Sequence, residues 1–243
     1  MFERTPDLDV VYVPWRGVDP DDAVRIGAAW LQQQPGAPLV LLHAKKMYGN
    51  NELLPRLTAG AAVEKPATVW RSGWRGGPVL APWPSEDVLA ALSDTLAQRT
   101  TAVCVIEWGD FDYQEAWLAA HGAVDLVTGQ VRGARRPLLD PVIEVAMRRL
   151  SDAVNHNNGL VQAYDKAYAV RTLQELVRCG HRYEVDALCA WALANGFTQR
   201  EVEHLRDYAT RALEGRSFRL RVGVGPQPGV CARWEQEAND GDT

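Results

Sequence analysis

The chain has 243 residues, of which 47% are apolar and 23% charged, as is usual for a soluble globular protein of one large or two modest domains. Its net charge of −5 argues against non-specific binding of nucleic acid or membrane by the whole surface. Four cysteines without framework spacing, and no apolar run long enough to span a bilayer, predict a cytoplasmic protein with reduced thiols and no membrane partner.

The charge is distributed unevenly along the chain. Residues 1–130 carry 16 acidic and 10 basic side chains, whereas residues 131–233 carry 11 acidic and 16 basic ones. Residues 234–243 add four acids and no base, which predicts an acidic disordered tail. Arginine far outnumbers lysine, alanine is abundant and isoleucine is rare, and this bias favours a GC-rich bacterial or phage gene.

Short apolar runs alternate with amphipathic segments over the first 130 residues. Helices are expected after the caps Asp19, Ser85 and Asp110, with a short one at 52–57. Strands are expected at 8–15, 38–43, 68–71, 78–82, 102–108 and 124–127. This order predicts an α/β, Rossmann-like domain (1–130), a mostly parallel sheet flanked by helices. The third and fourth strands are close enough for a hairpin or a local antiparallel edge.

Cationic and aromatic side chains follow several of the expected strands. In an open parallel sheet, ligands bind outside the carboxyl ends of the strands. Indole rings offer stacking surfaces, and guanidinium groups offer planar donors to phosphate or carboxylate. Alternatively, these residues have a purely structural role and pack over the edge of the sheet, where they cover the core. The predicted ligand-binding residues are Trp15, Arg16, Lys45, Lys46, Arg71, Trp74, Arg75 and Trp83.

Known phosphate-binding motifs are absent from the chain. Neither a P-loop nor a G-x-G-x-x-G turn after the first strand is present. Glu107 and Asp110 follow the fifth expected strand, where carboxylates can hold Mg²⁺ for phosphoryl transfer. Alternatively, Asp110 only caps the following helix.

Residues 131–139 form a basic linker with Gly and Pro, and residues 140–233 are expected to form a small all-α module. Its first helix begins at Asp140-Pro141, and others are expected at 164–179 and 184–195. Thr198 and Glu201 form a capping box at the start of a fourth helix, and Phe197 precedes it as a hydrophobic staple.

The helix pair at 184–213 has spacings seen in helix-turn-helix motifs, although the same corner occurs in bundles that bind no DNA. If the motif is functional, its outward residues read base edges. The predicted nucleic-acid-binding residues are Gln199, Arg200, His204 and Arg206.

Three further features have structural explanations. Residues 216–221 alternate Arg with other residues, which favours an edge strand over a phosphate-contacting arm. His156 lies among asparagines and reads as helix termination rather than catalysis. Cys179, His181 and Cys189 lack zinc-ligand spacing, and no nucleophile–base–acid set can be assembled from motifs.

The leading hypothesis is a non-catalytic protein that binds a nucleotide or nucleic acid through the Arg/Trp-rich strand ends and the basic helical module. A metal-dependent phosphoryl-transfer or nucleotide-processing enzyme at Glu107 and Asp110, with Mg²⁺ as its cofactor, is the first alternative. The second is an adaptor that acts through protein contacts alone.

Overall fold

The computed structural model describes residues 8–133, 138–156, 158–227 and 229–241. The chain divides into two units, residues 1–134 (unit 1) and residues 135–243 (unit 2), and each is described by itself. Across the described ranges, every helix is too short or too polar to cross a membrane.

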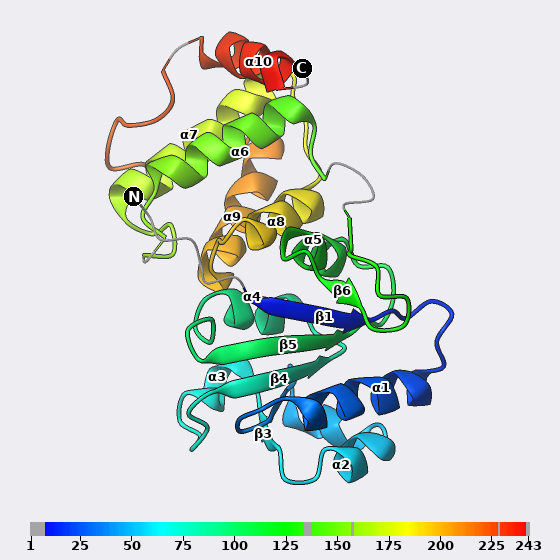
Figure 1. The fold of residues 1–243 in the computed structure, drawn as a ribbon. Helices are drawn as coiled ribbons and strands as arrows, with labels where there is room; N and C mark the ends of the chain where they lie inside the picture. Colours follow the sequence, from blue (N-terminus) through cyan, green and yellow to red (C-terminus); the bar gives the residue numbers. More distant parts are fainter. Residues whose placement is uncertain (1–7, 134–137, 157, 228, 242–243) are drawn as a thin grey trace. The chain divides into compact units, whose positions relative to one another are not determined.

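Unit 1 contains a six-stranded sheet in the order β3-β2-β4-β5-β1-β6, in which all paired strands are parallel (Figure 1). Its strands are β1 (Asp9–Val13), β2 (Leu39–Leu41), β3 (Ala62–Glu64), β4 (Gly77–Pro82), β5 (Thr100–Ile106) and β6 (Val124–Asp125). Its helices are α1 (Pro20–Gln33), η1 (Lys45–Gly49), α2 (Leu53–Leu57), α3 (Pro66–Val69), α4 (Glu86–Ser93) and α5 (Asp112–Ala120). The predicted α/β class with a parallel sheet is confirmed.

Helices cover both faces of this sheet: α1 and α2 pack on one face, and α3, α4 and α5 lie on the other (Figure 1). The core under α1 includes Val13, Leu80 and Ile106, all essentially inaccessible. Gly27 lets α1 approach closely, because a Cβ there would lie 2.9 Å from Cδ1 of Ile106. The face on which each helix packs determines the direction in which the chain leaves the preceding strand.

Local expectations in unit 1 were only partly right. Asp19 caps α1 by accepting a hydrogen bond from the backbone N–H of Asp21 at 2.9 Å. The predicted strand at 68–71 is wrong, since Pro66 begins α3 there and the missed third strand is β3. The hairpin or antiparallel edge predicted between 68–71 and 78–82 is wrong for the same reason, and the paired strands next to β4 are parallel to it. Asp110 does not cap α5, whose N-cap position is Phe111.

Unit 2 is helical, as expected. Its elements are α6 (Pro141–Ala153), α7 (Ala163–Arg178), α8 (Val185–Ala194), α9 (Gln199–Leu213) and α10 (Val230–Gly241). Helix α7 packs on α6 and α9, α8 packs on α9, and α10 packs on α6. The linker residues 134–137 lie outside the described residues.

The C-terminal part of unit 2 corrects two predictions. Of the tail predicted at 234–243, residues 234–241 belong to α10, which the buried Trp234 anchors, and residues 242–243 lie outside the described residues. Residues 216–221 form no strand; the ring of Phe218 instead packs edge-on against Tyr208. The alternating arginines of this segment therefore do not protect a sheet edge.

The cysteines do not all have reduced thiols. Cys179 and Cys231, 52 residues apart, form a disulfide, so the expectation of four reduced thiols is wrong for this pair. Cys104 and Cys189 are buried and outside the disulfide. Burial raises the pKa of the Cys104 thiol far above its usual range, which makes this side chain an inert part of the core.

Candidate functional site

The candidate site lies at the carboxyl ends of β1 and β5, which are neighbours in the sheet. The chain leaves β1 toward α1 on one face and leaves β5 toward α5 on the other (Figure 1). In open parallel sheets, ligands usually bind where the connections from two adjacent strands diverge to opposite faces. An ion pair between Arg16, after β1, and Asp110, after β5, joins the two loops.

Exposed aromatic rings gather on these two loops. Trp15 is 40% exposed, Trp108 60% and Phe111 37%, which is unusual for such large apolar side chains. The rings of Trp108 and Phe111 are stacked with centroids 6.4 Å apart, and Phe111 stacks on Tyr113 at 5.4 Å. The guanidinium of Arg16 lies 5.1 Å from the centre of the Trp15 ring. We call Trp15, Arg16, Trp108 and Phe111 the aromatic rim.

Gly109 is required by this arrangement. Its φ of +102° is rarely adopted by residues with a side chain, and a Cβ there would lie 3.1 Å from the ring of Phe111. The turn after β5 therefore places Phe111 against its own backbone while leaving the neighbouring Trp108 in solvent. The single Gly in Trp108-Gly109-Asp110 is the sequence signal that marks this turn.

Below the rim, Glu107 and Arg132 form an ion pair in which only 5% and 10% of the two side chains are exposed. The Arg132 guanidinium also lies 4.4 Å from the centre of the Tyr12 ring. Sequence reasoning missed Arg132, which falls in the segment predicted as linker. Glu107 is thus neutralised by Arg132 and Asp110 is paired with Arg16, so the predicted Mg²⁺ site has each carboxylate engaged by a different guanidinium.

The carboxyl ends of β2, β3 and β4 carry further predicted residues. Lys45 pairs with Glu64 at 2.9 Å, and Lys46 is exposed in η1. Burial tends to raise the pKa of Glu64, but hydrogen bonds from Lys45 and Thr68 together lower it. Trp83 donates its backbone N–H to Ile106 at 2.8 Å and has a φ of +52°, a strained value for a tryptophan. The charge of Lys45 is therefore balanced by Glu64.

Arg71, Trp74 and Arg75 do not join the carboxyl edge. They lie between α3 and β4, on the segment that leads to the amino end of β4. Trp74 is 5% exposed and donates its indole N–H to the carbonyl of Ala37, just before β2, at 2.8 Å. Arg71 lies 4.2 Å above the ring of Trp70. The prediction that these three residues lie at the carboxyl end of a strand is wrong, because the segment predicted as that strand begins with helix α3.

In unit 2, the corner between α8 and α9 forms as predicted. The capping box of Thr198 and Glu201 is present, and Phe197 and Val202 are buried. The proposed base-reading side chains, however, have partners within unit 2. Gln199 donates to Glu203 at 3.1 Å, and His204 Nδ1 lies 2.7 Å from the carbonyl of Arg200.

The remaining two side chains of that set are also engaged. Arg206 pairs with Asp186 of α8, and the Arg200 side chain lies where a Cβ of Gly159 would fall. These contacts give the outward face of α9 mixed charge rather than a basic stripe. These contacts therefore add no support to DNA reading by α9.

Sequence reasoning also missed a polar network that joins α6, the following turn and α9. His156 Nε2 lies 3.1 Å from Ser151 Oγ, and His156 Nδ1 lies 3.3 Å from Oε2 of the buried Glu201. The serine–imidazole–carboxylate order resembles a catalytic triad. His156 Nε2 is equally close to the backbone carbonyl of Ser151, at 3.1 Å, so the ring closes the end of α6.

This network predicts a pH-dependent stability of unit 2. The hydrogen bond with Glu201 raises the pKa of His156 and outweighs burial, which lowers it. A raised pKa in the folded state stabilises the fold below the unfolded pKa of about 6.5, and this contribution disappears as the pH rises through the folded value. Urea unfolding at about pH 6 and about pH 8 should show lower stability at the higher pH. His156→Gln should remove this difference, and an unchanged difference would contradict the assignment.

Comparison with known proteins finds one similarity, confined to unit 2. Residues 139–235 match the family described as "Domain of unknown function (DUF1889)", which covers less than half of the chain. No curated protein and no solved structure matches the chain. The aromatic rim lies outside the matched residues.

Proposed function

We propose that unit 1 is a non-catalytic binding module for a nucleotide, held at the aromatic rim. The observation that carries this proposal is the exposure of the Trp15, Trp108 and Phe111 rings at the point where the chain diverges from β1 and β5. Flat exposed rings next to a guanidinium suit a planar base with a phosphate attached.

The position of Arg16 supports a phosphate contact. Its ion pair with Asp110 is solvent-exposed, with 60% and 49% of the two side chains accessible. Exposed pairs of this kind contribute at most about 1 kcal/mol, so a phosphate can displace the carboxylate at little cost. Asp110→Asn should therefore strengthen nucleotide binding, because it releases Arg16 and removes a negative charge from the rim.

Calorimetric titration of the full chain with nucleoside monophosphates and short single-stranded oligonucleotides at low salt tests the proposal. Trp108→Ala should weaken binding by about 1–3 kcal/mol, the usual contribution of a base stacked on an aromatic side chain. Trp70→Ala is the matched control, because Trp70 is 55% exposed and also carries an arginine over its ring, but precedes β4. If the protein binds none of these ligands, the proposal is refuted.

The salt dependence distinguishes a nucleotide from a nucleic acid. A polymer that contacts several phosphates loses affinity steeply as salt rises, whereas a mononucleotide loses it gradually. The residue composition favours a bacterial or phage origin. The proposal does not include phosphoryl transfer, because Glu107 is paired with Arg132 and Asp110 with Arg16.

An adaptor function is favoured by the same exposure of Trp108. A ring that is 60% exposed beside two other aromatic rings also fits a protein contact. The titrations separate the two functions: an adaptor predicts no affinity for nucleotides in either the original protein or the Asp110→Asn variant.

A further inference from the structure

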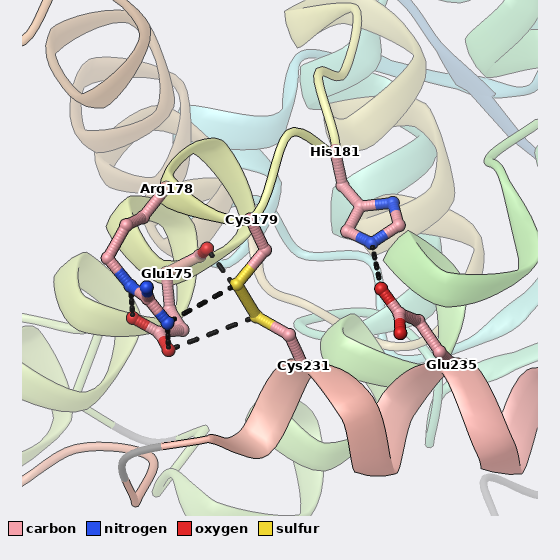
Figure 2. The surroundings of a disulfide bond; sticks show 6 residues. All are labelled: Glu175, Arg178, Cys179, His181, Cys231 and Glu235. Carbon is pink, nitrogen blue, oxygen red and sulfur yellow. Dashed lines mark hydrogen bonds and ion pairs between the residues drawn. A yellow bond between two sulfur atoms is a disulfide. The ribbon is translucent and has the colours of Figure 1, made fainter.

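The disulfide of unit 2 has a third metal-ligating side chain beside it. Cys179 follows the last turn of α7, and Cys231 lies in the first turn of α10. Glu175 lies one turn before Cys179 and therefore on the same face of the helix. Figure 2 shows the carboxylate beside the two sulfur atoms. Among the described residues, this is the group of three His, Cys, Asp or Glu side chains whose ligand atoms all lie within 4.8 Å of one another.

The spacing of these atoms suits a tetrahedral metal ion. Zinc binds thiolate sulfur at about 2.3 Å and carboxylate oxygen at about 2.0–2.2 Å, which places a sulfur and an oxygen ligand about 3.5 Å apart. Sγ of Cys231 lies 3.8 Å from Oε1 of Glu175. Two thiolates with one carboxylate favour zinc over magnesium or calcium, which prefer oxygen ligands alone. The disulfide itself excludes a metal, because each sulfur is bonded to the other.

The two cysteines stay close after reduction because other contacts hold α10 in place. His181, two residues after Cys179, pairs with Glu235 of α10 at 3.2 Å, as Figure 2 shows. Glu237 of α10 pairs with Arg149 of α6 at 2.9 Å. Trp234 is buried, which anchors the same helix by packing. Breaking the sulfur–sulfur bond therefore leaves both sulfurs near Glu175.

The guanidinium of Arg178 competes with a metal ion for the carboxylate of Glu175. Its Nε donates to Glu175 Oε2 at 2.8 Å, and its Nη2 lies 3.5 Å from Cys179 Sγ (Figure 2). Since 63% of the Arg178 side chain is exposed, it can turn into solvent when a cation takes its place.

We propose that Glu175, Cys179 and Cys231 form, after reduction, a binding site for a thiophilic divalent cation of the zinc class, with a fourth position open to water. A dithiol reductant supplies two electrons and two protons to the sulfur–sulfur bond and becomes a disulfide itself. The cation then displaces the two thiol protons into solvent. Cys179 and Cys231 thus alternate between a disulfide and a metal site. This proposal does not depend on the nucleotide site.

Cobalt(II) titration of the full chain tests this proposal, because cobalt bound by thiolates shows a charge-transfer absorption that cobalt bound by oxygen lacks. The protein is reduced, separated from the dithiol without air, and titrated with Co²⁺ and then Zn²⁺. One equivalent of Co²⁺ should give the absorption, and Zn²⁺ should abolish it. The oxidised protein should give none. No absorption in the reduced protein, or equal absorption in the oxidised protein, would overturn the proposal.

Variants assign the ligands. Cys231→Ser should lose the absorption, whereas Cys189→Ser, which alters a thiol outside the site, should keep it. Glu175→Gln retains both sulfurs and should weaken Co²⁺ binding about tenfold or more, by analogy with the loss of groups that support metal ligands. Arg178→Ala should strengthen binding by removing the competitor. Should Cys231→Ser fail to fold, Glu175→Gln decides: affinity equal to that of the original protein would overturn the three-ligand site.

Discussion

Replacing Arg132 with methionine is expected to lower the free energy of unfolding of unit 1 by about 3–5 kcal/mol, because it removes one member of a buried ion pair and leaves the other member, Glu107, buried. Among the described ion pairs of unit 1, this one is the most deeply buried, with exposures of 10% and 5%. The substitution also removes the guanidinium from the Tyr12 ring. Hydrogen exchange of the β1 and β5 amides in the full chain measures the loss for unit 1 specifically.

Two further variants make this prediction specific. Arg16→Met removes the exposed pair with Asp110 and should cost less than about 1 kcal/mol. The double variant Glu107→Leu/Arg132→Met should recover most of the stability that Arg132→Met loses, because it replaces both members of the buried ion pair with apolar side chains. If the double variant loses as much stability as Arg132→Met and Glu107→Leu lose together, the result would contradict the pairing.

Cys231→Ser is expected to destabilise unit 2 by about 2–4 kcal/mol. The disulfide spans 52 residues, and in the chain-entropy model a loop of this size stabilises the fold by about 4 kcal/mol. Urea unfolding of the full chain without added metal measures the change. Unit 1 should be unaffected, since the disulfide lies wholly within unit 2.

The reductant dependence provides the control for this prediction. A dithiol should lower the stability of unit 2 in the original protein to about that of Cys231→Ser, and should not change the variant further. A variant that remains sensitive to the reductant, or an original protein that is insensitive to it, would show that the disulfide does not hold α10 to α7 in solution.

The fold was largely predictable because its signals are local. Asp19-Pro20 and Asp140-Pro141 each combine a cap with a first-turn proline, and the structure begins α1 and α6 there. The capping box at Thr198 likewise marks the start of α9. Prediction failed at 68–71, where the β-branched Thr68 and Val69 favoured a strand while Pro66 begins a helix. The very short β3 carries too few residues for a clear period.

The site was less predictable because its partners are distant in sequence. Trp15, Arg16 and Asp110 were identified, but only the strand order places them together. Arg132 lies 25 residues after Glu107, in a segment that reads as linker. Cys231 lies 52 residues after Cys179, so spacing alone excluded a site that tertiary packing creates. Because 68–71 was predicted as a strand, Arg71, Trp74 and Arg75 were predicted at the carboxyl edge of the sheet, whereas they precede the amino end of β4.

Nuclear magnetic resonance of the indole N–H groups tests the nucleotide site most directly. The chain has nine tryptophans, and single Trp→Phe variants assign their signals. A saturating nucleoside monophosphate should shift the signals of Trp15 and Trp108 and leave that of Trp70 unchanged. Binding that shifts Trp70 alone, or that leaves the signals of Trp15 and Trp108 in place, would contradict a site at the carboxyl ends of β1 and β5.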